Sequence, residues 1–194
     1  MLKVNEIFGP TIQGEGHLVG MQALFVRFSG CNKKCDFCDT DHSKYVDMTP
    51  KEIVNKLIEL GKGVPYLVVI TGGEPLLQNT NELIVLCKLL KGKGFKTQLE
   101  TNGSINSEAL QYFDGVSCSP KQPASQCKIE WWWVDSLKVV WPGPLAPEEF
   151  NSIKVPNKYI QPCSEDYKPA IDKLLSMPVH WMLSVQIQKV IGVK

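Results

Sequence analysis

The chain has 194 residues, of which 43% are hydrophobic and 21% charged, proportions that are ordinary for a globular protein with a buried core. Its 21 basic and 20 acidic residues give a formal net charge of +1, which does not indicate binding to nucleic acid or to an anionic membrane. No apolar run approaches the roughly 20 residues that span a bilayer, and residues 1–10 lack the apolar stretch of a signal peptide. We expect a single domain over residues 1–194, located in the cytoplasm, with no nucleic-acid or membrane partner.

Five short segments are expected to form β-strands because they are rich in β-branched or aromatic residues. They are residues 23–28, 66–70, 95–99, 137–140 and 159–160. Helical patterns lie between them. Thr49 and Pro50, followed by Glu52, have the residue types of a helix N-terminus, and the apolar residues that follow recur at helical spacing. A second helix is expected over residues 81–90, and weaker ones begin near Pro147 and Glu165.

The alternation of strands and helices predicts an α/β fold with parallel strands. A closed barrel of about eight strands needs a longer chain, so we expect a partial (β/α) barrel of about six mostly parallel strands. In such folds the chemistry gathers at the carboxyl ends of the strands. The run Trp131, Trp132 and Trp133 is expected to pack in the core or at an edge, with a dimer interface or a lid as the alternative.

Three of the seven cysteines lie together directly after the strand at residues 23–28. Cys31, Cys35 and Cys38 form the pattern C-x3-C-x2-C, whereas the other four cysteines are scattered and are expected to be reduced thiols. Three thiolates leave one iron of a [4Fe–4S] cluster without a protein ligand, as a reactive site requires. A zinc site that adds His42 is the alternative, although the chain has no second C-x2-C pair.

The cysteine pattern, with Phe37 before its last cysteine, resembles the signature of the radical S-adenosylmethionine (SAM) superfamily. The resemblance implies that the cluster cleaves SAM to a 5′-deoxyadenosyl radical. Further motifs follow in the superfamily's order: residues 71–75, 100–103, 119–121 and 161–164. Glu74 is expected either to accept from the methionine ammonium or to fix its loop. The SAM contacts implied by the resemblance are Phe37, Cys38, Asp39, Gly72, Gly73, Glu74, Glu100, Asn102, Ser119, Pro120, Lys121, Gln161, Pro162, Cys163 and Ser164.

The opening residues 6–16 narrow the resemblance to the 7-carboxy-7-deazaguanine synthase family, which acts in queuosine and other deazapurine pathways. The resemblance implies a radical carbon–nitrogen lyase. It would contract 6-carboxy-5,6,7,8-tetrahydropterin to 7-carboxy-7-deazaguanine with release of ammonia. Arg27 is the only arginine and could bind the substrate carboxylate, with a structural salt bridge as the alternative. The expected substrate contacts are Ile12, Gln13, Gly14, Glu15, Arg27 and Thr71.

Other expectations from the same resemblance are Mg²⁺ at Thr40, a flavodoxin- or ferredoxin-type electron donor, and a homodimer. The family's closing segment commonly has threonine and histidine where this chain has Ile187 and Gln188, while Gln186 and Lys189 match. Glutamine can replace the hydrogen bond of that histidine but not its proton chemistry. The role of the tail therefore stays open.

Two functions from other classes remain as alternatives. A glycyl-radical-enzyme activase is also a small radical SAM protein, but it would leave the pterin-type opening motif without a role. A non-catalytic zinc or iron–sulfur module would explain the cysteines and leave Arg27 and the motifs at residues 71–75 and 100–103 unexplained.

Overall fold

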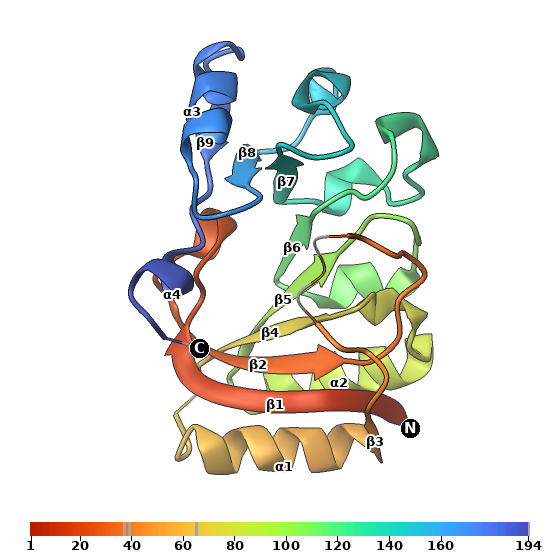
Figure 1. Cartoon of the computed structure of the whole chain (residues 1–194). Helices are drawn as coiled ribbons and strands as arrows, with labels where there is room; N and C mark the ends of the chain where they lie inside the picture. The colour runs from red at the N-terminus through yellow and green to blue at the C-terminus, as the bar shows by residue number, and fades with distance from the viewer. Residues whose placement is uncertain (37, 39, 65, 194) are drawn as a thin grey trace.

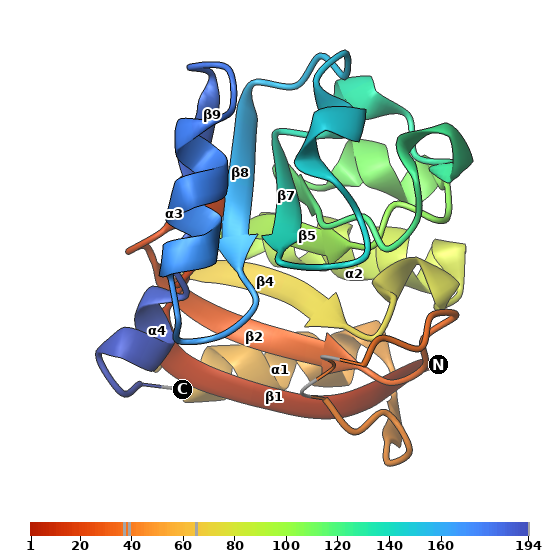
Figure 2. The same ribbon diagram turned by 45° about the horizontal axis from the view of Figure 1, so that its top comes forward.

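The computed structural model describes residues 1–36, 38, 40–64 and 66–193. In this part of the chain nine strands form one sheet in the order β3-β1-β2-β4-β5-β6-β7-β8-β9 (Figures 1 and 2). The strands are β1 (Leu2–Ile12), β2 (Gln22–Phe28), β3 (Val46–Met48), β4 (Leu67–Gly72), β5 (Lys96–Thr101), β6 (Gly115–Cys118), β7 (Ser136–Trp141), β8 (Asn157–Pro162) and β9 (Trp181–Leu183).

The sheet is mostly parallel and, over the described residues, does not close into a barrel. Strands β2 and β4 to β9 pair in parallel, whereas β1 pairs antiparallel with both β2 and β3. The strands turn steadily from β1 and β2, which run across Figure 2, to β8, which stands upright. The expected partial (β/α) barrel is therefore confirmed, with nine strands instead of about six.

The additional strands are β1, β3, β6 and β9, and each lacks the pattern of a regular strand. The pairing of β1 with β2 is shifted between Phe8 and Thr11, next to Gly9 and Pro10, so its alternation is interrupted. Strand β6 has four residues, and the edge strands β3 and β9 have three each. Such short segments depend on their neighbours in the sheet rather than on their own composition.

Two long helices, α1 (Pro50–Leu60) and α2 (Thr80–Gly92), cover one face of the sheet (Figure 1). The expected start of α1 is confirmed: the Thr49 hydroxyl accepts from the Glu52 backbone N–H at 3.3 Å, and Glu52 accepts from the Thr49 N–H at 2.7 Å. Phe28 and Ile70 are fully buried in the main core beneath these helices.

The connections after β5 contain mainly short 3-10 helices. They are η3 (Glu108–Tyr112), η4 (Ala124–Gln126), η5 (Trp131–Trp133) and η6 (Pro147–Phe150), to which η1 (Gly16–Leu18) and η2 (Pro75–Leu77) add earlier in the chain. The helix expected near Pro147 is thus η6, and the one expected near Glu165 is α3 (Lys168–Leu175), which covers β8 and β9. A four-residue helix, α4 (Ile187–Val190), ends the fold.

A second core joins α3 and η6 to the last parallel strands. Leu137, Phe150 and Ile160 are fully buried there. Trp131 packs edge-on against Phe150, with ring centroids 6.4 Å apart, whereas Trp132 is 74% exposed. Core packing therefore accounts for the first tryptophan of the run only. Among the described residues, no helix is both long and apolar enough to cross a membrane.

Candidate active site

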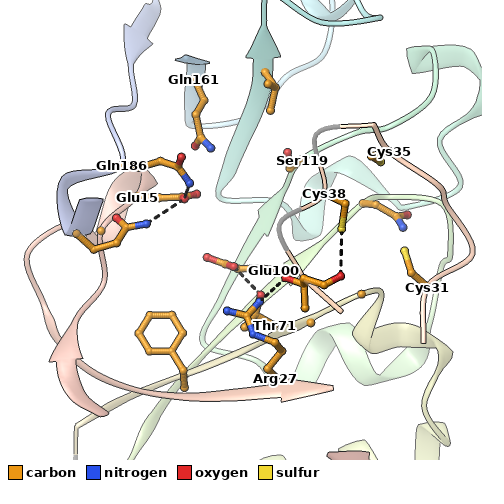
Figure 3. A pocket seen from close by; sticks show the side chains of 18 of the residues that line it. Glu15, Arg27, Cys31, Cys35, Cys38, Thr71, Glu100, Ser119, Gln161 and Gln186 are labelled. Atoms are coloured by element: carbon orange, nitrogen blue, oxygen red, sulfur yellow. Dashed lines mark hydrogen bonds between the residues drawn. The ribbon is translucent and has the colours of Figure 1, made fainter. Parts of the chain in front are cut away.

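A cavity of about 730 Å³ opens at the carboxyl ends of the parallel strands. Its walls include Arg27 from β2, Thr71 from β4, Glu100 from β5 and Gln161 from β8. In Figure 3, the three labelled cysteines lie on one side of the cavity and Glu15 and Gln186 lie on the opposite side. The expectation that the motifs after the strands meet at one edge of the sheet is confirmed by this arrangement.

Cys31, Cys35 and Cys38 line the same wall of the cavity, and all three are free thiols. Burial raises the pKa of the Cys35 thiol, Lys121 acts in the opposite direction, and the other two thiols raise it further. Cys35 is therefore under the electrostatic influence of both other cysteines of the loop. Phe37 and Asp39, which were expected to contact SAM, lie outside the described residues.

The two metal alternatives differ in how close together their ligands must lie. Over the described residues, no group of three or more ligating side chains is gathered closely enough to hold one metal ion. Zinc would need such a gathering, with sulfurs about 2.3 Å from one centre, whereas a four-iron cube accepts its ligands at separate corners. His42, the fourth ligand in the zinc alternative, contacts Cys38 through Nε2, 3.6 Å from Sγ.

Gly72, the last residue of β4, and Gly73 pack closely against the backbone that leads into the cysteine loop. A Cβ added to Gly72 would lie 2.2 Å from the Phe28 carbonyl oxygen, and one added to Gly73 would lie 2.2 Å from the Gly30 oxygen. The backbone N–H of Gly73 donates to Phe28 at 3.1 Å. Both glycines line the cavity, but the close approach that requires them is to the protein's own backbone.

Glu74 lies behind the cavity wall. It is fully buried, and its carboxylate accepts from the Thr101 hydroxyl at 2.9 Å, from the Asn102 backbone N–H at 2.7 Å and from the Leu76 N–H at 3.0 Å. Burial raises the pKa of Glu74, and these hydrogen bonds oppose the rise. Of its two expected roles, the contacts support fixing of the loop, because Glu74 is fully buried and is not among the residues that line the cavity.

Arg27 projects from β2 onto the cavity floor (Figure 3). Its Nε donates to Glu6 Oε1 at 2.9 Å, and its Nη1 donates to the Thr40 hydroxyl at 3.2 Å. The guanidinium also lies 5.8 Å from the centroid of the Phe8 ring. The salt bridge considered as the alternative role of Arg27 is therefore present, and it orients a side chain that still lines the cavity.

A buried hydrogen-bonded network links the opening motif to the strand ends. Gln13 Nε2 donates to Gln98 Oε1 at 2.7 Å and to Glu100 Oε1 at 3.2 Å. The other oxygen of Glu100 accepts from the Thr71 hydroxyl at 2.8 Å. Glu100, Gln13 and Thr71 thus form one connected wall of the cavity.

Glu15 is held by a buried lysine and by the tail of the chain. Its Oε2 is in contact with Lys138 Nζ, and its Oε1 accepts from Gln186 Nε2 at 2.5 Å and from Gln188 Nε2 at 3.5 Å. Burial opposes ionisation of Glu15, but Lys138 and the two amides outweigh it and lower the pKa to about 2. The backbone N–H of Ile187 donates to the Gly14 carbonyl at 3.1 Å, which ties the tail to the opening motif.

Most of the other expected SAM contacts also reach the cavity. Lys121 donates to the Ser119 hydroxyl at 2.8 Å and to its carbonyl at 3.0 Å. The amide oxygen of Gln161 is buried and has no hydrogen-bond partner among the described residues, so it is available to a ligand. The expected residues that line the cavity here are Cys38, Gly72, Gly73, Glu100, Asn102, Ser119, Lys121, Gln161, Pro162 and Cys163. Those expected but not among the lining residues are Glu74, Pro120 and Ser164.

Several side chains in or next to the cavity were not identified from the sequence. Phe8 and Phe25 line the cavity as a stacked pair, with centroids 4.8 Å apart and planes 7° apart. Lys33 and Lys34 line it from the cysteine loop. Lys138 was also missed, although a charged residue inside an otherwise apolar strand was the signal that could have revealed it.

Comparison with known proteins agrees with this geometry. A model of the radical SAM superfamily matches residues 25–119, which contain the cysteine loop and the strands β4 to β6. The chain is 37% identical to the 7-carboxy-7-deazaguanine synthase of Bacteroides thetaiotaomicron over 100% of both chains. It is 35% identical to that of Caulobacter vibrioides, over 97% of each.

A solved structure supports the same relationship. The crystal structure of QueE from Escherichia coli matches with a TM-score of 0.71 and 25% identity, covering 95% of this chain and 93% of that one. The fold and the site define a radical SAM protein. Within that superfamily, the chain belongs to the 7-carboxy-7-deazaguanine synthase family.

Proposed function

We propose that this chain converts 6-carboxy-5,6,7,8-tetrahydropterin to 7-carboxy-7-deazaguanine with release of ammonia, as a radical SAM carbon–nitrogen lyase. One observation carries the proposal: the three cysteines and the side chains expected to recognise the pterin line opposite sides of one cavity. Substrate and product differ by one ammonia alone, so the overall reaction consumes no net oxidant. The sites named below are proposals of the same kind.

Cys31, Cys35 and Cys38 would hold a [4Fe–4S] cluster. When bound, the cluster and SAM supply a 5′-deoxyadenosyl radical that removes a hydrogen atom from the substrate. The chain's own task on this side is to hold the cofactor: Gly72 and Gly73 anchor the loop, and Lys121, Ser119 and Gln161 offer polar atoms along the cavity wall.

The pterin would lie between the cluster side and Glu15. Gln13 and Glu15 would pair with the donors and acceptors of the ring edge, helped by backbone groups of Ile12 and Gly14, while Thr71 and Glu100 form the adjoining wall. Leaving such groups unpaired in a closed cavity costs about 1–3 kcal/mol each, so they would also reject other rings. Glu6 would orient Arg27 toward the substrate carboxylate.

Mg²⁺ would bind next to Arg27, at the hydroxyl of Thr40. Arg27 lies within hydrogen-bonding distance of Thr40, so Mg²⁺ and the guanidinium would repel each other unless an anion lay between them. The substrate carboxylate would be that anion. Mg²⁺ retains water ligands and readily takes oxygen ligands from substrates. The Thr40 hydroxyl and the substrate carboxylate would therefore be enough to hold it, together with water. The metal and the arginine would then share one carboxylate.

The partners proposed with this function are a flavodoxin- or ferredoxin-type electron donor and a second copy of the chain. All seven cysteines are free thiols in the structure, which supports a reducing compartment such as the cytoplasm. A glycyl-radical-enzyme activase is less well supported, because Glu15 and the Gln13–Glu100–Thr71 network are buried groups suited to a small polar ring rather than to an extended peptide.

The decisive experiment is mass spectrometry of the products. The anaerobically reconstituted protein is incubated with SAM, dithionite, Mg²⁺ and 6-carboxy-5,6,7,8-tetrahydropterin. The expected result is formation of 7-carboxy-7-deazaguanine and ammonia in equal amounts. Cleavage of SAM without conversion of the pterin would overturn the proposed substrate, and absence of both cluster and SAM cleavage would support a non-catalytic metal module.

A further inference from the structure

Lys138 is a buried lysine that stands just behind the cavity. It lies on β7 and is 6% exposed, and it is absent from the residues that line the cavity. Its Nζ contacts Glu15, whose side chain does line the cavity. A buried ammonium is costly unless it is paired, so this contact commits Lys138 to Glu15.

The carboxylate of Glu15 is also fixed from the tail of the chain. Gln186 donates to its second oxygen at 2.5 Å, and the two side chains meet in Figure 3. The surrounding backbone is tied down as well, because Gly16 N–H donates to the Ser184 hydroxyl at 3.1 Å. Glu15 is therefore oriented by contacts on each of its oxygens, one from β7 and one from the C-terminal segment.

We propose that Lys138 is a positioning residue for substrate recognition: it holds Glu15 as an ionised, oriented acceptor for the amino-bearing edge of the pterin ring. The inference rests on the proposed function. It adds that Lys138, which touches no ligand itself, sets the preference for an amino group over an oxo group at that edge. A carboxylate only accepts hydrogen bonds, whereas a protonated carboxyl also donates one and loses this preference.

Among the charged groups around Glu15, Lys138 is the one that lowers the pKa of its carboxyl group. Lys121 also faces Glu15, but it is shared with the thiols of Cys35 and Cys118. Glu100 faces Lys138 and helps to keep it charged, and Lys189 of α4 lines the same cavity. With Lys138 present, the pKa of Glu15 lies at about 2, despite its burial. Without Lys138, burial is offset by the two amides alone, so the pKa of Glu15 rises.

The test compares pterin binding by wild-type and Lys138→Met holoenzymes across pH. The probe is 6-carboxy-5,6,7,8-tetrahydropterin. Protonation of the probe affects its binding to both proteins equally, so we compare the ratio of the two affinities at each pH. Glu15 stays ionised in the wild type, so its contribution is constant. In the variant the pKa of Glu15 is raised, so affinity relative to wild type should fall as the pH is lowered and the buried carboxyl takes up a proton, by about tenfold once it is protonated.

A second readout uses the analogue that carries an oxo group in place of the 2-amino group. Wild-type enzyme should prefer the amino compound by about tenfold or more, because an oxo group faces a carboxylate without a proton between them. The Lys138→Met variant should lose most of that preference at low pH. Lys138→Gln keeps a hydrogen-bond donor toward Glu15 but removes the charge. Both measurements are repeated with this variant if Lys138→Met does not fold.

Lys158 provides a matched control on the neighbouring strand β8. It is 5% exposed, and its Nζ donates to the carbonyls of Phe150 at 3.0 Å and Asn151 at 2.8 Å, away from the cavity. Lys158→Met should lower stability while its affinity ratio to wild type stays constant with pH. The same constant ratio in the Lys138 variants, with unchanged preference for the amino group, would overturn the inference. If wild-type enzyme binds no tetrahydropterin, the proposed function fails first and takes this inference with it.

Discussion

The guanidinium of Arg27 donates to the hydroxyl of Thr40 across 3.2 Å. Arg27 comes from β2 and Thr40 from the end of the cysteine loop, so the contact joins the strand to the loop that would hold the cluster. It also places the residue expected to bind the substrate carboxylate beside the residue expected to bind Mg²⁺. The two proposed subsites therefore cannot be altered independently.

Thr40→Val should lower turnover and abolish its dependence on Mg²⁺. The substitution removes the hydroxyl oxygen at nearly constant shape, and with it the proposed Mg²⁺ ligand and one contact of Arg27. Turnover at several Mg²⁺ concentrations is measured together with SAM affinity, which should change little because the Thr40 hydroxyl is not among the expected SAM contacts. A variant that retains full, metal-stimulated turnover would show that Thr40 is not a ligand.

Alanine in place of Cys31, Cys35 or Cys38 should abolish the absorbance of a stable [4Fe–4S] cluster after reconstitution, because a second iron is then left without a protein ligand. Cys163→Ala is the matched control, since this thiol lines the same cavity without belonging to the loop. Iron and sulfide content and the absorbance spectrum decide the matter. Loss of the cluster in the Cys163 variant would contradict the assignment of ligands.

Gly73→Ala should destabilise the protein by about 1–3 kcal/mol and impair cluster assembly. A methyl group there would lie 2.2 Å from the Gly30 oxygen and 2.7 Å from Cys31 Cβ, so the cysteine loop would have to move. Gly92→Ala is the control, because a Cβ at that position of α2 meets nothing within 4 Å. Thermal unfolding and iron content are compared, and equal behaviour of the two variants would refute the packing argument.

Much of this site follows from local sequence patterns. The cysteine loop and the motifs at residues 71–75 and 100–103 each follow a strand that its own composition indicates, and parallel strands bring their ends together. Arg27 could be selected because it is the only arginine, in an otherwise apolar strand. These predictions depend on short segments of sequence, so they did not require the correct number of strands.

The contacts that depend on pairing between distant segments could not be predicted. Glu6 reaches Arg27 because the two residues are opposite each other in the β1–β2 register, and β1 was not recognised as a strand. Lys138 and Glu15 are separated by 123 positions. No local pattern specifies which buried carboxylate a buried lysine will meet, since that depends on how the tail and η1 fold over the sheet.

Glu74→Gln should cost about 1–3 kcal/mol of stability. The carboxylate accepts from backbone N–H groups of Leu76 and Asn102 on different oxygens, so an amide must point its own N–H₂ at one of these donors. Glu59→Gln provides a control, because that side chain is 75% exposed. Chemical denaturation is measured with SAM affinity: a large loss of affinity at unchanged stability would instead assign Glu74 to the ammonium of SAM.

Replacement of Arg27 separates a pterin-specific site from a general radical SAM site. Arg27→Ala should weaken binding of the tetrahydropterin by about 2–5 kcal/mol, because the substrate carboxylate would be left buried without its partner. Arg27→Lys keeps the charge but loses the planar fork that contacts Glu6 and Thr40 together, so it should recover only part of the affinity. Glu6→Gln keeps the arginine and loosens its orientation, and should have a smaller effect in the same direction.

Cluster content and SAM cleavage without substrate should be retained in all three variants, because neither requires the pterin. The measurements are substrate affinity and release of 5′-deoxyadenosine in the absence of pterin. Unchanged pterin binding in Arg27→Ala would place the carboxylate elsewhere, and loss of the cluster would make Arg27 a support of the cysteine loop through Thr40.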